Sequence, residues 1–160
     1  MNTILLIGAC GSGKTWVCKE VIKEFNLNKS AKIKTIHFKT NDKISVVGKY
    51  TGHIFDGTDR LSMSVMKDVD YLKHIQEKHQ MIILAEGDRF MNKTFITKFK
   101  PYIIKIQNDG SEGRKKRNSS QSERQIKSIN TRVANINSNI SVKDSFEAYG
   151  LIKKIINENT

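Results

Sequence analysis

Residues 8–15, which read GACGSGKT, follow directly on an apolar run at positions 3–7. They match the pattern G-x-x-x-x-G-K-[ST] at every fixed position, and an amphipathic stretch comes after them. Glycines at these positions allow successive backbone amides to approach phosphate oxygens, and the start of a helix adds a partial positive charge. The pattern therefore predicts a strand, a phosphate-binding loop and a helix, in that order.

The same stretch predicts a nucleoside triphosphate as the ligand. The Lys14 ammonium can reach the β- and γ-phosphates, and the Thr15 hydroxyl can bind Mg²⁺. The alternative is a glycine-rich turn with an incidental lysine, but average residue usage makes a chance match in this context rare. The nucleotide-binding residues that we predict are Gly8, Gly11, Ser12, Gly13, Lys14 and Thr15.

Apolar runs and amphipathic stretches alternate along the rest of the chain. The strands that we expect are at residues 3–8, 33–38, 81–85 and 102–106, with 44–47 as a further short candidate. The expected helices are at residues 14–25, 68–79, 94–99 and 122–136, with a last one at the end of the chain. Residues 109–120 are polar, basic and aperiodic. This alternation predicts one α/β domain over residues 1–160, in which helices cover both faces of a parallel sheet in three layers.

Two carboxylates follow the apolar run at 81–85. Ligands of parallel sheets bind beyond the carboxyl ends of the strands, where the glycine-rich loop also lies. Glu86 comes first off its strand, so we predict that it binds Mg²⁺ together with Thr15. The alternative is an exposed turn, in which Glu-Gly-Asp is ordinary. Arg89 can bind phosphoryl groups, or it can pair with Asp88 and be structural.

The chain resembles the P-loop kinase superfamily, specifically its small nucleotide-kinase-like members. The motifs that carry the resemblance are GSGKT at 11–15, GKYTG at 48–52, GTDRLS at 57–62 and AEGDRF at 85–90. The resemblance implies ATP as the phosphoryl donor. The last three motifs are similar to those of small bacteriophage-encoded P-loop kinases, some of them assigned to phosphorylating hydroxymethylated pyrimidines in phage DNA. The Asp-Arg pair at 88–89 looks like that of thymidylate-kinase-like enzymes, which implies that Arg89 steadies phosphoryl groups.

Residues 48–62 occupy the part of the chain that supplies the acceptor site in nucleotide kinases. Asp59 can accept a proton from an attacking hydroxyl. Arg60 and Lys49 can hold a phosphate, and Tyr50 or Phe55 can stack on a base. The alternative is a structural loop in which Asp59 caps a helix and pairs with Arg60.

Residues 109–132 are the segment that closes over the phosphates in P-loop kinases, according to the resemblance. Its basic residues are Arg114, Lys115, Lys116, Arg117, Arg124, Lys127 and Arg132, against the acidic Asp109, Glu112 and Glu123. Arginines in such a lid neutralise the charge of the transferring group, so we predict catalytic roles for Arg114, Arg117 and Arg124. The alternative is a solvated run of charges.

The charge of the chain favours a polyanionic partner. Lys and Arg number 28 against 16 Asp and Glu, which gives a formal net charge of +12. Nucleotides, nucleic acid and acidic lipid heads all fit this charge, and a merely lysine-rich surface is the alternative. The sequence has no apolar run of bilayer-spanning length and no basic leader, so we expect no membrane partner. Two cysteines without CxxC spacing predict free thiols and a cytoplasmic protein, in the host if the chain is phage-encoded.

These features together predict an ATP- and Mg²⁺-dependent phosphotransferase whose acceptor is a nucleotide or a hydroxymethylated pyrimidine in DNA. The predicted catalytic residues are Lys14, Asp59, Arg89, Arg114, Arg117 and Arg124. The predicted substrate-binding residues are Lys49, Tyr50, Asp59 and Arg60. The alternative is an ATP-switched nucleic-acid-binding P-loop ATPase without a phosphoacceptor. The charge supports that alternative, and the acceptor loop counts against it.

Overall fold

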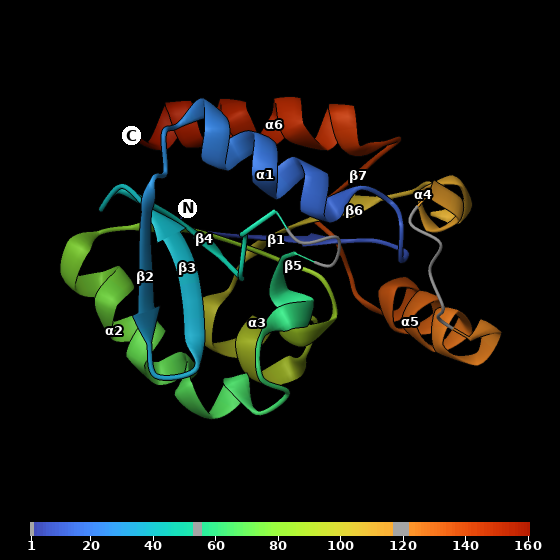
Figure 1. Cartoon of the computed structure of the whole chain (residues 1–160), viewed down its shortest axis with the longest axis horizontal. Coiled ribbons are helices and arrows are strands. Elements are labelled where there is room, and N and C mark those ends of the chain that lie inside the picture. Colours follow the sequence, from blue (N-terminus) through green and yellow to red (C-terminus); the bar gives the residue numbers. More distant parts are fainter. Residues whose placement is uncertain (1, 53–55, 117–121) are drawn as a thin grey trace.

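A computed structural model describes residues 2–52, 56–116 and 122–160 (Figure 1). Its strands are β1 (Thr3–Ile7), β2 (Lys29–Ile33), β3 (Ile36–Thr40), β4 (Ile44–Val47), β5 (Ile82–Glu86), β6 (Tyr102–Ile106) and β7 (Ile140–Val142). Its α-helices are α1 (Lys14–Glu24), α2 (Val69–His79), α3 (Lys93–Phe99), α4 (Ser111–Lys116), α5 (Glu123–Asn135) and α6 (Ser145–Asn159). Short 3-10 turns are η1 (Thr58–Arg60), η2 (Val65–Asp68) and η3 (Asp88–Phe90).

The strands form one sheet of seven, in the order β2-β3-β4-β5-β1-β6-β7. The pairs β4–β5, β5–β1, β1–β6 and β6–β7 are parallel, whereas β3 runs antiparallel to both β2 and β4. The predicted α/β fold with a parallel sheet is therefore confirmed for the five strands from β4 to β7 in the sheet order. At the opposite edge the prediction is wrong, because that edge is an antiparallel hairpin.

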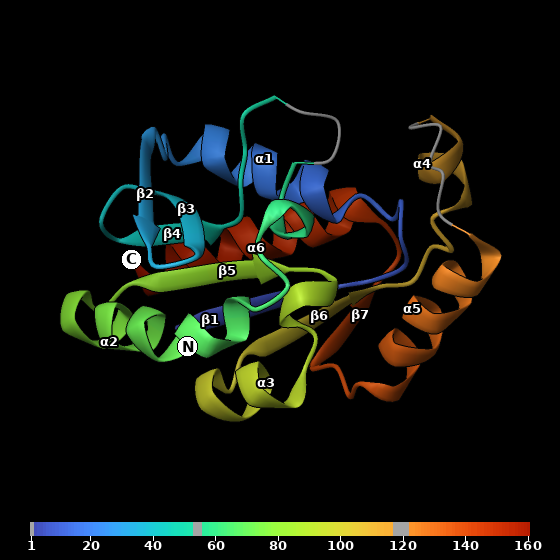
Figure 2. The same ribbon diagram turned by 60° about the horizontal axis from the view of Figure 1, so that its bottom comes forward.

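Helices pack on both faces of the sheet, as Figures 1 and 2 show. Alternate residues of β1 point to opposite sides, as in any strand. Ile4 and Leu6 belong to the core under α1 and α6, which lie side by side. Leu5 and Ile7 belong to the core under α2 and α3. Because β1 is buried on both sides, it reads in the sequence as one continuous apolar run.

The β2–β3 hairpin replaces the single strand expected at 33–38. Lys34 and Thr35 form its turn, with Lys34 in the left-handed region at φ 55°. The Thr35 amide donates to the Asp68 carboxylate at 3.1 Å, and the Thr35 hydroxyl donates to the same carboxylate oxygen. This turn contains neither glycine nor proline and is fixed by a residue 33 positions away. Local sequence therefore gives no sign of it.

Two further elements differ from expectation. Residues 111–116, within the stretch expected to be aperiodic, form the short helix α4. Residues 140–142 form the edge strand β7, which pairs parallel with β6 and buries only Val142. In both cases a short element is held by its neighbours rather than by its own pattern of apolar residues.

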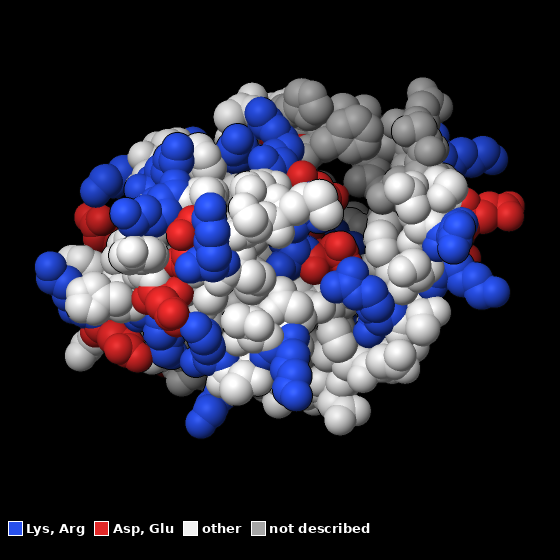
Figure 3. Space-filling model, turned by 90° about the horizontal axis from the view of Figure 1, so that it is seen from below, with Lys and Arg blue, Asp and Glu red and all other residues white. Residues whose placement is uncertain are grey.

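The surface carries charges of both signs on the side of α2 and α3. Figure 3 shows acidic side chains interspersed among basic ones over this side. In the part of the chain that the structure describes, no helix is long and apolar enough to cross a membrane.

Candidate functional site

The candidate site lies beyond the carboxyl ends of β1 and β5, which are neighbours in the sheet. Leu6 of β1 pairs with Glu86 of β5, so the chain that leaves each strand enters the same space. Residues 8–13, here named the glycine loop, connect β1 to α1. This edge of the sheet is where ligands of parallel α/β folds bind, and the two stretches predicted to form the site meet here.

The glycine loop adopts a conformation that only glycine accommodates easily. Gly11 and Gly13 have φ values of 83° and 100°. Gly13 is the N-cap of α1 and offers no side-chain cap, so the first amides of this helix are left without the usual capping acceptor. The Ser12 hydroxyl is buried and has no hydrogen-bond partner among the described residues. The loop therefore retains polar donors for an anionic ligand.

The Lys14 side chain is hydrogen-bonded to the glycine loop. Its ammonium donates to the carbonyl oxygens of Gly8 and Ala9, both at 2.9 Å. The side chain is thus folded back over the loop that precedes it. Carbonyl oxygens are weaker partners for an ammonium than phosphate oxygens, so a bound phosphate can displace them.

Thr15 and Glu86 form the oxygen pair predicted to bind metal. The Thr15 hydroxyl lies 3.5 Å from Glu86 Oε1 and 3.3 Å from the Asp56 carbonyl oxygen. Glu86 is only 4% exposed. Burial raises the pKa of Glu86 to about 7, against the opposing effect of the Lys14 charge. A cation placed next to a buried carboxylate of this kind stabilises its ionised form.

This oxygen pair fits Mg²⁺. Mg²⁺ in phosphate-binding sites uses one or two protein oxygens and completes its shell with water and phosphate oxygens. A hydroxyl and a carboxylate supply that number. The described residues contain no group of three or more His, Cys, Asp and Glu side chains that could hold a metal by themselves. A metal at this site therefore depends on the ligand for its remaining oxygens.

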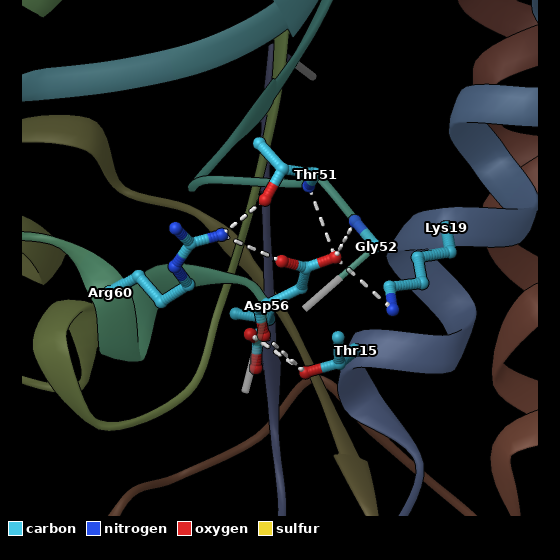
Figure 4. Close-up of polar contacts among 7 residues, drawn as sticks. Thr15, Lys19, Thr51, Gly52, Asp56 and Arg60 are labelled. Atoms are coloured by element: carbon cyan, nitrogen blue, oxygen red, sulfur yellow. Dashed lines mark hydrogen bonds and ion pairs between the residues drawn. The ribbon is translucent and has the colours of Figure 1, made fainter. Parts of the chain in front are cut away.

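Asp56 joins residues 51–52 to Arg60 and Lys19 next to this pair, although no sequence pattern singled it out. Its carboxylate is fully buried and accepts hydrogen bonds from the Thr51 and Gly52 amides at 3.1 and 2.7 Å (Figure 4). It also forms ion pairs with Arg60 at 2.9 Å and with Lys19 of α1 at 3.3 Å. Burial alone raises the pKa of Asp56, but these four partners outweigh it and the pKa is lowered.

The predicted acceptor residues Asp59, Arg60 and Lys49 lie in different environments. Asp59 is exposed on η1, and its charge is close enough to raise the pKa of Glu86 further. Arg60 forms an ion pair with Asp56, so the alternative in which it pairs with Asp59 is wrong. Lys49 is half-buried, and its backbone forms an antiparallel bridge with Gly57.

Tyr50 is not placed to stack on a base. It is only 8% exposed, belongs to the core under α1, and donates its hydroxyl to the Val47 carbonyl at 3.2 Å. An aromatic ring packed in this way has no free face for a ligand, so the prediction of a stacking role for Tyr50 is wrong. Phe55, the other predicted stacking residue, lies outside the described residues.

Arg89 and Asp88 lie together at the end of β5. Arg89 Nη1 is 3.9 Å from Asp88 Oδ2, and Arg89 Nε is buried without a hydrogen-bond partner among the described residues. Arg132 of α5 also pairs with Asp88 and donates to the Met91 carbonyl at 3.1 Å. Asp88 is therefore shared by two arginines. Arg89 keeps hydrogen-bonding capacity for an anion.

The first part of the basic segment packs directly on the glycine loop. Arg114 of α4 donates to the Cys10 carbonyl at 2.7 Å. A methyl group added to Gly110 would lie 1.9 Å from that same carbonyl oxygen, and one added to Gly113 would lie 2.0 Å from the Gly11 carbonyl oxygen. The two backbones therefore touch, which requires glycine at both positions.

The other predicted lid arginines are placed differently. Arg124 is exposed on α5, and among the described residues it forms no hydrogen bond or ion pair with the glycine loop. Arg117 lies outside the described residues. Of the three predicted lid arginines, Arg114 is thus the one whose described contacts reach the site.

Comparisons with known proteins do not assign a family. No protein-family model matches the chain, and no curated protein matches it in sequence. The function must therefore be argued from the site itself.

Proposed function

We propose that this protein is an ATP- and Mg²⁺-dependent phosphotransferase of the P-loop kinase type. Its proposed acceptor is a nucleotide or a hydroxymethylated pyrimidine in DNA. The observation that carries the proposal is the meeting of Lys14, Thr15 and Glu86 at the carboxyl ends of β1 and β5. A cation, an uncapped helix start and an oxygen pair at one point are the groups that binding of Mg²⁺ and a triphosphate requires.

Each residue has a role in this proposal. Lys14 leaves the Gly8 and Ala9 carbonyls and binds the β- and γ-phosphates, while the amides at the start of α1 bind phosphate oxygens. Thr15 and Glu86 would hold Mg²⁺, which when bound neutralises charge on the phosphate oxygens. Cys10 and Cys18 are free thiols, which suits the reducing cytoplasm in which we place the activity.

The acceptor side of the proposed reaction depends on the acceptor. With a hydroxyl acceptor, the exposed Asp59 takes the proton as the oxygen attacks the γ-phosphorus and ADP leaves. With a phosphate acceptor no base is required, and Arg60, Lys49 and Arg89 hold the acceptor charge. In this proposal Arg114, Arg117 and Arg124 form a basic lid that stabilises the transferring group.

The competing proposal is an ATP-switched nucleic-acid-binding protein that hydrolyses ATP slowly. The net charge of +12 favours it. Buried contacts of Asp56 join residues 51–52 to Arg60 and Lys19, which favours the phosphotransferase, because residues held in this way beside Thr15 and Glu86 are suited to position an acceptor.

The direct test is incubation with γ-labelled ATP and Mg²⁺ in the presence of nucleosides, nucleotides or DNA that contains hydroxymethylated pyrimidines. We expect the label to appear in one of these acceptors. Label released only as inorganic phosphate would overturn the phosphotransferase and favour the switch.

A further inference from the structure

The β2–β3 hairpin carries a face of polar and basic side chains. The antiparallel register places Lys32 opposite His37 and Ser30 opposite Lys39. Directly opposed residues in a sheet point to the same side, so these four form one surface, here named the basic hairpin face. Lys39 Nζ contacts Ser30 Oγ at 2.6 Å across the two strands.

The basic hairpin face lies on the same side of the sheet as α1. Lys39 pairs with Val46 of β4, whose side chain is in the core under α1. Ser30 and Lys32 are exposed, and His37 and Lys39 are partly exposed. The face is therefore open to solvent. The opposite side of the hairpin carries Ile36 and Phe38, which are buried in the other core.

The charge of the hairpin region is strongly positive. Residues 29–49 contain six lysines and a single carboxylate, Asp42, which pairs with Lys29 at 3.5 Å. Burial lowers the pKa of His37, and the nearby charges of Lys49, Lys32 and Arg60 lower it further. These cations therefore share one neighbourhood. The side of α2 and α3 differs, because there acidic side chains lie among the basic ones (Figure 3).

This positive region continues into the candidate site. The Lys49 amide donates to the Gly57 carbonyl at 3.0 Å, and the Gly57 amide donates back at 2.7 Å. Gly57 itself lies against Thr15 and Glu86, the oxygen pair predicted to bind metal, since a methyl group added to it would be 2.6 Å from Glu86 Oε1. A polyanion on the basic hairpin face would thus extend toward Glu86 and Thr15.

We propose that the basic hairpin face binds the phosphate backbone of DNA and presents a polynucleotide acceptor to the site. Delivery to the site rests on the proposed phosphotransferase function, whereas DNA binding does not. Lysines on an edge strand also prevent sheets from pairing edge to edge. That role does not explain Lys39 and His37, because β3 is an interior strand of the sheet. Contacts of lysines with phosphates supply affinity without reading sequence.

The test measures binding of a fluorescein-labelled DNA duplex by anisotropy, without ATP, over a range of salt concentrations. We expect the double variant Lys32→Gln/Lys39→Gln to bind more weakly and to lower the slope of log affinity against log salt by about two. The charge-retaining variant Lys32→Arg/Lys39→Arg should restore both values. The matched control is Lys93→Gln/Lys154→Gln, which removes two exposed lysines on α3 and α6 and should lower the slope much less.

The outcomes separate this proposal from the proposed function. Unchanged DNA binding in the Lys32→Gln/Lys39→Gln variant would overturn it, and so would binding of anionic phospholipid vesicles with no binding of DNA. If the variant loses transfer to DNA but keeps transfer to a free nucleotide, the delivery role is supported. If wild-type protein transfers label to no acceptor while its DNA binding depends on these lysines, the proposed function fails and the DNA-binding face stands.

Discussion

The Thr15 hydroxyl and the Glu86 carboxylate lie 3.5 Å apart although 71 positions separate them in the chain. They are brought together because β1 and β5 are parallel neighbours, with Leu6 in register with Glu86. Glu86 is buried, and only the Lys14 charge, its hydrogen bonds and a bound cation can offset the cost of its ionisation. Because Glu86 is buried, we expect its ionisation to depend on both pH and a bound cation.

Replacement of Glu86 by glutamine should stabilise the metal-free protein more at pH 8 than at pH 5. In the unfolded chain the carboxyl titrates near 4.5, whereas burial raises its pKa to about 7 in the folded protein. As pH rises through this window, the folded wild type bears the growing cost of a buried charge. Its free energy of unfolding should fall relative to Glu86→Gln by about 3 kcal/mol at most.

Denaturant unfolding in EDTA at the two pH values measures this difference. The exposed Glu158→Gln serves as control and should show no such trend. A gap between wild type and Glu86→Gln that is the same at pH 5 and pH 8 would contradict the assigned environment of Glu86.

Replacement of Lys14 by alanine should reduce phosphoryl transfer by orders of magnitude and leave the fold intact. Among the described residues the Lys14 ammonium donates hydrogen bonds to the Gly8 and Ala9 carbonyl oxygens, and when its charge is removed the buried Glu86 can take up a proton, so the fold should be retained. Its proposed role appears only with phosphate bound. Transfer assays and thermal unfolding measure the two effects, and the exposed Lys23→Ala on the same helix is the control. Transfer at the wild-type rate in Lys14→Ala would remove the phosphate-binding assignment.

Asp56 and Asp59 should respond in opposite ways to replacement by alanine. Asp56→Ala leaves Arg60, Lys19 and two backbone amides without their shared buried acceptor, so we expect a loss of about 3 kcal/mol in the free energy of unfolding. Asp59 is exposed, and its removal should change stability by less than about 0.5 kcal/mol. If the acceptor is a hydroxyl, Asp59→Ala should still lower the rate of transfer by about 100-fold or more.

Chemical denaturation and single-turnover transfer distinguish the two residues. Equal stability losses for both variants would show that the hydrogen-bond network of Asp56 does not hold the loop in solution.

Two glycines in helices provide a matched pair for the contact between α4 and the glycine loop. Alanine favours a helix over glycine by about 1 kcal/mol at an exposed position, and Gly150 of α6 has nothing within 4 Å of an added methyl group. Gly150→Ala should therefore raise the melting temperature. Gly113→Ala gains the same propensity, but its methyl group would meet the Gly11 carbonyl oxygen at 2.0 Å and displace α4. We expect Gly113→Ala to lower the melting temperature and weaken ATP binding. The same response from both variants would mean that α4 does not rest on the loop.

The strands and helices next to the site were predictable because their patterns are strong. β1 and β5 are buried on both faces and therefore read as apolar runs, and α1 follows its loop with regular spacing. The hairpin was not predictable, because its turn at Lys34 is stabilised by Asp68 from a distant segment. The sequence alone shows no sign of that contact.

The sequence predicted that Lys14, Thr15 and Glu86 meet at one edge of the sheet, and the structure brings them together there, while their roles stay predictions. At other positions, the burial of the side chain decides which role the residue can have. Asp56 and Asp59 differ little in the sequence, yet one is enclosed by four donors and the other faces solvent. Tyr50 likewise has an aromatic ring of the kind that stacks on bases, but it is buried in the core. Which of two similar side chains is enclosed depends on the tertiary fold.

Calorimetric titration of the wild-type protein with ATP in the presence of Mg²⁺ tests the central claim most directly, with Lys14→Ala titrated beside it. We expect saturable binding of one ATP per chain that weakens strongly without Mg²⁺ and in the variant. Absence of heat from ATP or any other purine triphosphate, with Mg²⁺ present and the protein folded, would contradict a triphosphate site at the glycine loop.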